Sequence, residues 1–362
     1  MAETITAAVG TPPALNHFSD VETVQSLLNQ VPDTEGGPSP LLDVDGMIGP
    51  LTIAAIRRFQ QRQFGWNDGR VDTNKVTIAR LNDFDLDPAP GNPVKFQEFE
   101  PNFGFDPPNP VRGSAPWQMV PLGGSKIVLV VGGGGVRQVT SNNLGIARPL
   151  FLGGAVQIFG VARGTAIIKL RDANGRVLAR LDVSVKRKRT MRTSFFFVQD
   201  NNRRTTRTAA DVDPVLQGMN DIWLPQANVE FVRKLVKDPE PYNDDFGAEV
   251  LDPSALPAAN RPRDEWAAVV SHRDRGADFN VFFVWDVEQD LDTTTDGIEA
   301  STGPPEKSCV VDEATNTAIG TIVAHEAGHG MGLPDTGNPP ELMFRAPALT
   351  KIPRAHVDRV NP

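Results

Sequence analysis

A stretch dense in proline separates the first part of the chain from the rest. It spans residues 85–121 and contains nine prolines: Pro88, Pro90, Pro93, Pro101, Pro107, Pro108, Pro110, Pro116 and Pro121. Proline fixes the backbone angle φ and lacks an N–H donor, so this stretch predicts a stiff, extended linker. Its aromatic residues, among them Phe96, Phe105 and Trp117, indicate that part of it lies against a neighbouring domain.

The composition of the chain limits the classes of protein to which it can belong. Its 362 residues are 40% hydrophobic, which is enough for two or three domains with cores of their own. A formal net charge of -9 argues against a general nucleic-acid binder. The single cysteine, Cys309, excludes an intrachain disulfide and a cysteine-rich zinc site. No signal peptide and no apolar run of about 20 residues is recognisable, so no membrane span is expected.

Residues 18–84 predict a small three-helix bundle. Three runs with apolar residues at helical spacing, VETVQSLLNQV, GPLTIAAIRRFQQRQF and TNKVTIARLNDF, are separated by the turn signals DVDGMIGP and WNDGR. This order resembles the peptidoglycan-binding domain of bacterial cell-wall enzymes. The resemblance implies peptidoglycan as a partner and draws attention to Asp45, Gly46, Gly49, Phe59, Asp68 and Gly69. Alternatively, these positions only build the bundle, which then serves as a docking or prodomain unit.

Residues 122–187 predict an all-β sandwich. Short runs rich in β-branched residues, KIVLVV, AVQIFGVA, TAIIKLRD and VLARLDVSV, are separated by turns such as DANG. The order, with Gly164-Thr165-Ala166 opening a late strand, resembles the bacterial immunoglobulin-like domains of surface proteins. That resemblance implies a spacer or adhesive module without chemistry of its own.

Residues 188–362 mix strand and helix patterns, as expected for an α+β catalytic domain. TSFFFVQD, NVEFVRKLV and FNVFFVWDVE have the composition of strands, whereas DVDPVLQGMNDIWLPQA has apolar residues at helical spacing. The run TNTAIGTIVAHEAGHGMG predicts a helix that is apolar on the turns before its first histidine. A buried, rigid helix of this kind suits a metal site.

The segment HEAGHGMGLPD, residues 325–335, arranges candidate metal ligands in a fixed pattern. His325 and His329 are four residues apart and therefore lie on one helix face, where both imidazoles can reach one ion. Gly332 can adopt a positive φ, which turns the chain so that Asp335 can supply a third ligand. Three protein ligands leave the fourth tetrahedral position of zinc to water, as in catalytic sites. Glu326, about 100° around the helix from His325, is the candidate general base.

The pattern HExxHxxGxxD resembles the long zinc-binding motif of the metzincin clan of metallopeptidases, over roughly residues 190–362. The resemblance implies a methionine beneath the metal, for which Met343 in ELMFR is the candidate. The motif usually ends in histidine, and Asp335 stands there in this chain. A carboxylate leaves less net positive charge on the metal, so we expect a less acidic bound water and easier metal loss at low pH.

An acidic run suggests a second metal site of a different kind. Hard oxygen ligands that could bind a structural calcium cluster in DVEQDLDTTTDG, at Asp286, Glu288, Asp290, Asp292 and Asp296. The spacing of an EF-hand is missing, which favours a solvated acidic loop.

Together these features predict a zinc metalloendopeptidase that hydrolyses peptide bonds in proteins. Its N-terminal domains place it outside the cell or in the cell envelope, after export by an unrecognised route. Two alternatives stay open: a hydrolase of peptidoglycan cross-links with the same metal site, and a binding protein or adhesin with a degenerate peptidase domain. The intact Glu326 argues against the last, because a scaffold has no need of that carboxylate.

Overall fold

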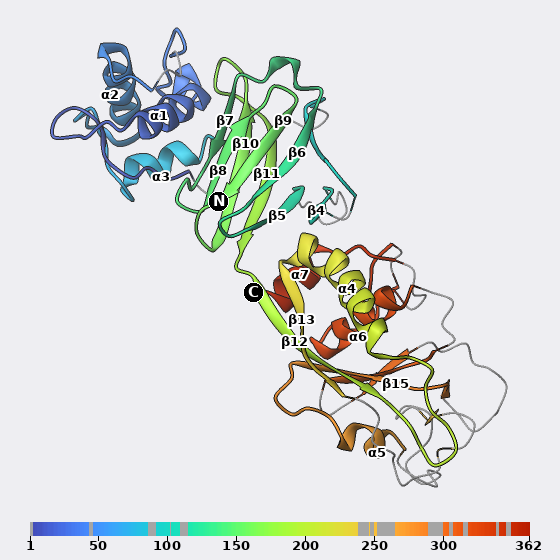
Figure 1. Cartoon of the computed structure of the whole chain (residues 1–362). Helices are drawn as coiled ribbons and strands as arrows, with labels where there is room; N and C mark the ends of the chain where they lie inside the picture. Colours follow the sequence, from blue (N-terminus) through green and yellow to red (C-terminus); the bar gives the residue numbers. More distant parts are fainter. Residues whose placement is uncertain are drawn as a thin grey trace. The chain divides into compact units, whose positions relative to one another are not determined.

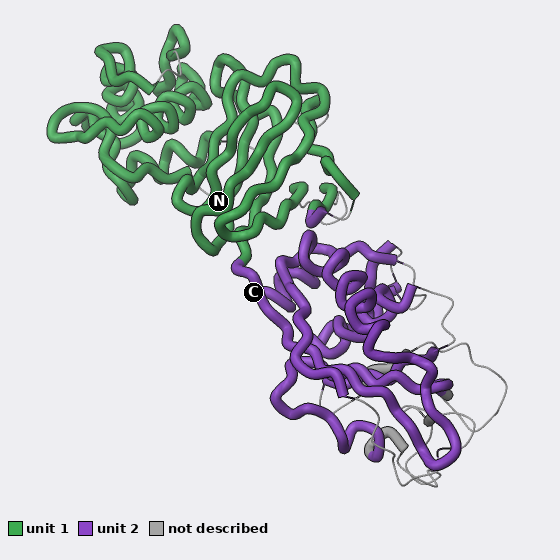
Figure 2. The backbone as a smooth tube through the Cα atoms, in the orientation of Figure 1, with its two compact units in different colours: residues 1–101, 105–186 green, residues 102–104, 187–362 purple. Residues whose placement is uncertain are grey.

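The computed structural model divides the chain into two compact units (Figure 2). Unit 1 comprises Met1–Pro101 and Phe105–Lys186, and unit 2 comprises Asn102–Gly104 and Arg187–Pro362. The structure describes residues 3–42, 46–85, 92–101, 103–108, 115–237, 246, 250–251, 265–288, 300–303, 307–313, 318–337, 340–344 and 349–362.

The first part of unit 1 is a helical module built from α1 (Phe18–Gln30), α2 (Pro50–Phe64) and α3 (Val76–Asn82) (Figure 1). The short strand β1 (Val9–Gly10) pairs antiparallel with β2 (Arg70–Val71) and ties the N-terminal segment to the helices. The apolar residues at helical spacing meet in one core, which includes Val21, Val24, Leu27, Leu28, Ile56, Phe59, Ile78 and Leu81. The three helices predicted from the sequence are confirmed.

A buried glutamine on α1 holds the loop that leads into α2. The side-chain amide of Gln25 donates to the carbonyl oxygen of Met47 at 3.1 Å and to the hydroxyl of Thr52 at 3.3 Å. Its carbonyl oxygen accepts from the backbone N–H of Gly46 at 3.0 Å. One buried side chain thus supplies hydrogen-bond partners to both the N–H of Gly46 and the carbonyl oxygen of Met47.

The same hydrogen-bond pattern is found between the next helix, α2, and the loop that follows it. The amide of Gln60 on α2 donates to the carbonyl oxygen of Arg70 at 2.7 Å and to the hydroxyl of Thr77 at 3.3 Å, while its oxygen accepts from Gly69 N at 2.8 Å. The module is therefore an internal repeat in which α2 ends the first copy and begins the second.

The second part of unit 1 is a β-sandwich. One sheet has the order β4-β5-β11-β10-β7 and the other β3-β6-β9-β8. The strands are β3 (Lys95–Glu98), β4 (Phe105–Asp106), β5 (Trp117–Pro121), β6 (Ser125–Val131), β7 (Gln138–Ser141), β8 (Ala147–Phe151), β9 (Ala155–Gly160), β10 (Gly164–Arg171) and β11 (Val177–Lys186). Inward-facing residues of both sheets alternate with outward-facing ones and form one core.

The proline-dense segment differs from the linker that the sequence predicted over residues 85–121. Its strands β3, β4 and β5 belong to the sandwich, and Phe96, Phe105 and Val120 are buried in the sandwich core. The indole Nε1 of the buried Trp117 donates to Ser184 Oγ at 2.8 Å. Proline is excluded only from ladder positions that need an N–H, so strands can form between the prolines. The sandwich therefore begins before residue 122, the start expected from the sequence.

A buried cluster of four charges joins the helical module to the sandwich within unit 1. Lys169 and Arg171 on β10 meet Glu3 and Asp85, and all four side chains are at most 5% exposed. Glu3 Oε1 lies 3.3 Å from both Lys169 Nζ and Arg171 Nη2, and Asp85 contacts the same two cations. The two positive and two negative charges stabilise one another at a buried position where water does not solvate them.

Unit 2 is built around a mixed sheet with the order β13-β12-β15-β18-β17. Strands β12 (Arg189–Phe197), β13 (Val229–Lys237), β15 (Phe279–Phe283) and β18 (Ser308–Val311) are parallel, and β17 (Ala300–Gly303) pairs antiparallel with β18 at one edge. A two-stranded sheet of β14 (Val250–Leu251) and β16 (Val287–Glu288) accompanies it.

Helices cover this sheet, which explains its long apolar strands. Helices α4 (Val212–Ala227), α6 (Ile319–Gly330) and α7 (Arg354–Val360) gather on one face (Figure 1). Residues of α5 (Glu265–Ser271) share a core with Phe196, Phe282 and Val310 of the strands. Parallel strands buried on both faces need apolar side chains throughout, as in the run SFFF of β12. Helices packed with a mainly parallel sheet agree with the mixed pattern of the sequence.

We predict that Arg171→Met destabilises unit 1 by about 3–5 kcal/mol, because it leaves buried carboxylates with one cation for two anions. The matched control is Arg58→Met, which breaks an exposed pair with Asp33 and should cost less than about 1 kcal/mol. Native-state hydrogen exchange of the β10 and β11 amides in the full chain measures the loss in unit 1 by itself. Equal losses in the two variants would contradict the compensating role of the cluster.

A second prediction concerns Lys126, which is 5% exposed and whose pKa burial lowers to about 8, with Glu100 acting in the opposite direction. Between pH 8 and the ordinary value of 10.5, the unfolded chain binds more protons than the folded one, so the free energy of unfolding rises with pH. Lys126→Met should therefore stabilise unit 1 at pH 7, by on the order of 1–2 kcal/mol, with a gain that fades towards pH 10.5. Hydrogen exchange of β6 at pH 7 and 9.5 tests this, and a gain independent of pH would show that the charge is not the cause.

Candidate metal centre

Helix α6 is held against α4 by two glycines and an indole. A Cβ on Gly218 would lie 2.9 Å from Gly320 Cα, so the two helix backbones touch where neither residue has a side chain. One helical turn further on, the buried Trp223 of α4 donates its Nε1 hydrogen to the carbonyl oxygen of Ala324 at 3.0 Å. These contacts fix the turn of α6 that carries His325.

The two histidines of α6 are oriented through the ring nitrogen that faces away from the site. His325 Nδ1 lies 2.7 Å from the carbonyl oxygen of Leu342, and His329 Nδ1 lies 2.9 Å from that of Leu333. A carbonyl oxygen only accepts, so in each neutral imidazole the hydrogen is on Nδ1. Both Nε2 atoms then carry a lone pair.

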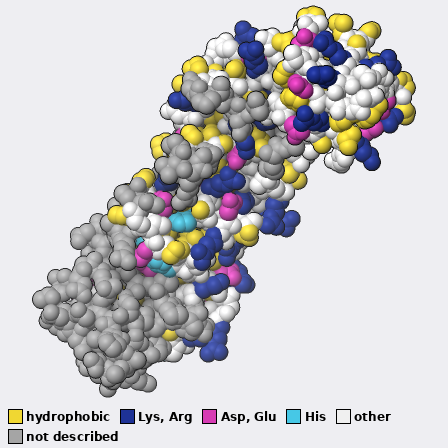
Figure 3. Space-filling model, turned by 180° about the vertical axis from the view of Figure 1, so that it is seen from behind, with side chains coloured by type: hydrophobic (Ala, Val, Ile, Leu, Met, Phe, Trp, Pro, Cys, Tyr) yellow, Lys and Arg dark blue, Asp and Glu magenta, His cyan; other side chains and the backbone are white. Residues whose placement is uncertain are grey.

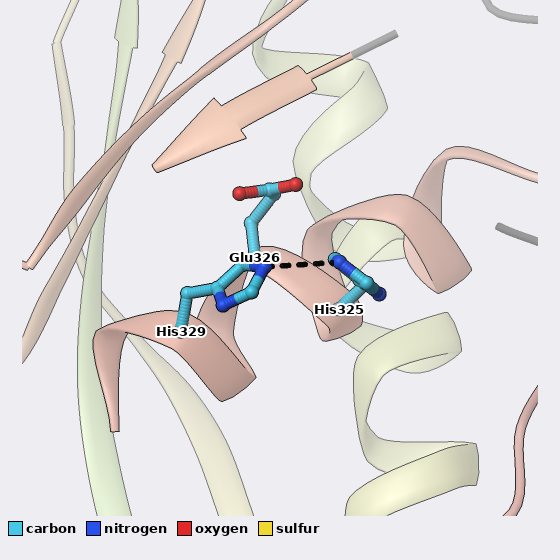
Figure 4. A group of neighbouring side chains, drawn as sticks. All are labelled: His325, Glu326 and His329. Carbon is cyan, nitrogen blue, oxygen red and sulfur yellow. Dashed lines mark hydrogen bonds between the residues drawn. The ribbon is translucent and has the colours of Figure 1, made fainter. Parts of the chain in front are cut away.

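These two lone pairs face each other. His325 Nε2 and His329 Nε2 are 3.1 Å apart, with the rings at 80° to one another (Figure 4). Two acceptors this close repel unless a cation or a proton lies between them. Imidazole Nε2 atoms in this arrangement are common ligands of transition-metal ions.

Asp335 is brought to the same point by the turn that ends α6. The N–H of Gly332 donates to His329 O and that of Leu333 to Gly328 O, which is the hydrogen-bond pattern of a Schellman turn. Gly332 occupies its left-handed position with a φ of 88°, where a side chain would be strained. The chain leaves the helix there and returns, so that Asp335 Oδ1 lies 3.4 Å from His325 Nε2 and 3.3 Å from His329 Nε2.

The three acceptor atoms form a triangle with edges of 3.1, 3.3 and 3.4 Å. A tetrahedral zinc site with bonds of about 2.0–2.1 Å has edges of about 3.3 Å between its ligand atoms. The donor set of two imidazoles and one carboxylate, and its spacing, therefore fit such an ion without rearrangement.

Glu326 is buried and belongs to the same cluster. Its carboxylate, His325 and His329 each offer a ligand atom, and these atoms all lie within 4.8 Å of one another (Figure 4). Cys309 lies beside it on β18: burial, and next the negative charge of Glu326, hold the pKa of that thiol well above its usual range. The thiol of Cys309 is therefore neutral. The charged group next to the two imidazoles on the side facing β18 is the carboxylate of Glu326 and not the thiol.

Met343 lies directly beneath the histidine helix. It is fully buried, and a Cβ on Gly328 would lie 2.3 Å from its sulfur. Met343 also follows Leu342, whose carbonyl oxygen orients His325. Gly328, Leu333 and Leu342 do not stand out in the sequence as parts of the site. Only the glycine between the two histidines could have been noticed, because the two carbonyl oxygens carry no sequence signal.

The site opens to the surface on one side. His325 is buried, whereas the side chains of His329 and Asp335 are 25% and 38% exposed. In the space-filling view, histidine and acidic side chains of unit 2 lie next to each other at the surface (Figure 3). A ligand atom could therefore be reached from solvent without opening the sheet.

Several other residues named from the sequence lie elsewhere or are not described. Asp290, Asp292 and Asp296 of the proposed calcium site are outside the described residues, as is Asp45 of the helical module. Among the described histidines, His325 and His329, together with Glu326, belong to a group that could hold a metal, and Asp335 lies beside it; His17, His272 and His356 do not belong to it.

The remaining positions singled out in the helical module have roles inside it. Phe59 is fully buried, and Gly49 precedes the first turn of α2. Gly46 and Gly69 have positive φ, and their N–H groups bond the two buried glutamines. Asp68 accepts from the amide of Gln60 at 2.8 Å. These residues build the two equivalent loops.

Comparison with known proteins assigns one part of the chain. Residues 19–78 match a family model described as a putative peptidoglycan binding domain. Among curated proteins, none matches this chain. In the part of the chain that the structure describes, no helix has the length and apolar character needed to cross a membrane.

The contact of Gly328 with Met343 yields a test of how the centre is supported. Gly328→Ala places a methyl group on the sulfur of Met343, which should destabilise unit 2 by about 1–3 kcal/mol and weaken the binding of added zinc, used as the probe metal, at least tenfold. Gly337→Ala is the control, because a Cβ there meets open space. Competition with a chromophoric chelator measures zinc affinity. Unchanged affinity in Gly328→Ala would mean that the methionine does not support the site.

Proposed function

We propose that the protein is a zinc metalloendopeptidase that hydrolyses peptide bonds in proteins. His325, His329 and Asp335 hold the zinc, and Glu326 acts as the general base. The observation that carries the proposal is the triangle of two imidazole nitrogens and one carboxylate oxygen, whose edges of 3.1–3.4 Å are close to the roughly 3.3 Å of a tetrahedral zinc site.

The ligand set leaves one position for chemistry. A structural zinc site has four protein ligands, whereas a catalytic site keeps its fourth position for water or substrate. Here three ligand atoms converge, and Asp335 and His329 border the solvent-accessible side. Glu326 could instead be a ligand, since its carboxylate lies in the same cluster. The distances of Asp335 Oδ1 to both Nε2 atoms favour the carboxylate of Asp335 for that role.

A zinc ion held by His325, His329 and Asp335 would polarise the scissile carbonyl group and lower the pKa of a water molecule to about 7. The carboxylate of Glu326 would take the proton of the attacking water as its oxygen adds to the carbonyl carbon. The same carboxyl group then gives the proton to the leaving nitrogen as the C–N bond breaks, so the products are a carboxylate and an amine. The Nδ1 hydrogen bonds of His325 and His329 keep both rings in the orientation that this step needs.

The resemblance of residues 190–362 to the metzincin clan supports the same proposal. The pattern HExxHxxGxxD, the left-handed Gly332 and the buried Met343 under the helix are the features of this chain that agree with it. The carboxylate of Asp335 in place of a third imidazole predicts easier loss of the metal at low pH.

A second candidate function follows from the peptidoglycan-binding domain at residues 19–78. That domain suggests a protein of the cell envelope, where peptidoglycan cross-links are peptide bonds available to the same centre. The sandwich, which resembles immunoglobulin-like domains of bacterial surface proteins, would act as a spacer in either case. The substrate, protein or peptidoglycan, is decided by experiment.

The decisive test compares wild type with Glu326→Gln, which removes the base but keeps the size of the side chain. We expect both proteins to bind one zinc and only the wild type to cleave casein, with a loss of at least about 10²-fold in kcat/KM for the variant. Asp221→Asn, at an exposed carboxylate of α4, is the control and should retain activity. Activity should also vanish with a chelator and return with zinc.

The alternatives give different results in the same experiment. Loss of zinc in Glu326→Gln would make Glu326 a ligand. Release of muropeptides from purified sacculi without cleavage of casein would favour the peptidoglycan hydrolase. Wild type that binds zinc and cleaves neither substrate would overturn the proposal in favour of a degenerate centre.

A further inference from the structure

The buried residues of the helical module cannot be the ones that touch a ligand. The side chains of Gln25 and Gln60 make hydrogen bonds to the backbone of the two loops, including the N–H groups of the loop glycines. Phe59 is buried in the core. The match to a peptidoglycan-binding family therefore identifies a fold and leaves the contact surface open.

Exposed apolar side chains are concentrated on this module. Among the described residues, the five most exposed large hydrophobic side chains all belong to it, at 58–76%: Leu51, Leu15, Met47, Phe18 and Val76. Soluble proteins scatter single exposed apolar residues, but a concentration on one small module marks an interaction site. Hydrophobic and basic side chains share the module surface that Figure 3 displays.

Three of these side chains come from the start of α1, the loop before α2 and the first turn of α2: Phe18, Met47 and Leu51. The Phe18 ring covers Gly46, since a Cβ on that glycine would lie 2.6 Å from the ring. Met47 is the next residue of the loop, and Leu51 is on the first turn of α2. Gln25 holds this loop from inside, so Met47 points outward from a rigid backbone. The apolar surface is thus presented by a fixed element.

Exposed basic side chains follow on α2. Arg58 lies about two helical turns after Leu51 on the same side of the helix and pairs with Asp33, whereas Arg57 is about a third of a turn away from that line, with its Nε 2.8 Å from a Cβ placed on Gly69 in the second loop. Peptidoglycan consists of N-acetylated pyranose rings, which offer apolar C–H faces, and of peptide stems, which carry carboxylates. An apolar surface next to cationic side chains is complementary to both.

We propose that Phe18, Met47 and Leu51 form the surface on which this protein binds the glycan strand of peptidoglycan, with Arg57 towards the carboxylates of the stems. This inference deepens the proposed envelope function and rests on the peptidoglycan part of it alone. It does not need the metal centre.

Cosedimentation of the full chain with purified peptidoglycan sacculi tests the surface. The double variant Met47→Gln, Leu51→Gln should raise the apparent Kd at least tenfold, because both side chains are exposed and their loss leaves the core intact. The matched control is Leu150→Gln, Leu152→Gln, which alters two leucines that are about half exposed in and next to β8 and should bind like wild type. Oligomers of N-acetylglucosamine should compete with sacculi for the wild type.

Each outcome separates this inference from the peptidase proposal. Sacculus binding by Met47→Gln, Leu51→Gln at wild-type affinity, or equal losses in both double variants, would overturn the surface. Wild type that fails to sediment with sacculi, or is not displaced by the sugar oligomers, would overturn it as well. Cleavage of soluble casein should be the same in the double variant and wild type. Glu326→Gln should still sediment, so failure of the catalytic assay leaves the binding result readable.

Discussion

The orientation of two imidazole rings is the constraint on which the proposed chemistry depends. Each ring gives its Nδ1 hydrogen to a backbone carbonyl oxygen, one from Leu342 and one from Leu333, and this leaves both Nε2 lone pairs directed at one point. Side chains could swing away from such a mutual repulsion, whereas hydrogen bonds to backbone atoms hold them in place. The two facing acceptors stay in place only if the rest of the domain holds the rings.

That support comes from packing around α6. The glycine contact with α4, the hydrogen bond of Trp223 and the sulfur of Met343 against Gly328 approach the helix from different directions. The apolar strands below it form a sheet covered on both faces, and its interior cannot shift without opening voids. The exposed edge of the site is formed by His329 and Asp335, which agrees with a centre that is rigid beneath and accessible above.

In the helical module of unit 1, buried side chains hold the loops and exposed side chains of the same loops face solvent. A buried glutamine bonds the loop backbone in both copies of the repeat. Gln25 donates to the carbonyl oxygen of Met47 and Gln60 to that of Arg70, and each of these residues directly follows the loop glycine. Lys169 and Arg171, the buried cations of β10, pair with Glu3 and Asp85. The helical module is therefore attached to the sandwich by buried ion pairs and not by apolar contacts alone. The outward side chains of the loops are thereby free to differ in chemistry, apolar in the first copy and basic in the second.

The sequence by itself determined the local features of this protein. Helical spacing placed His325 and His329 on one face, the left-handed requirement singled out Gly332, and the apolar periods separated the helical module from the strands. The proline-dense segment was misjudged as a linker, because composition does not reveal which residues between prolines pair with distant strands. Only the tertiary structure brought Met343 under Gly328, the carbonyl oxygen of Leu342 to His325, and Glu3 to Arg171 across 168 residues. Periodicity describes a residue and its near neighbours, whereas these contacts depend on the path of the whole chain, which packing of the complete core decides.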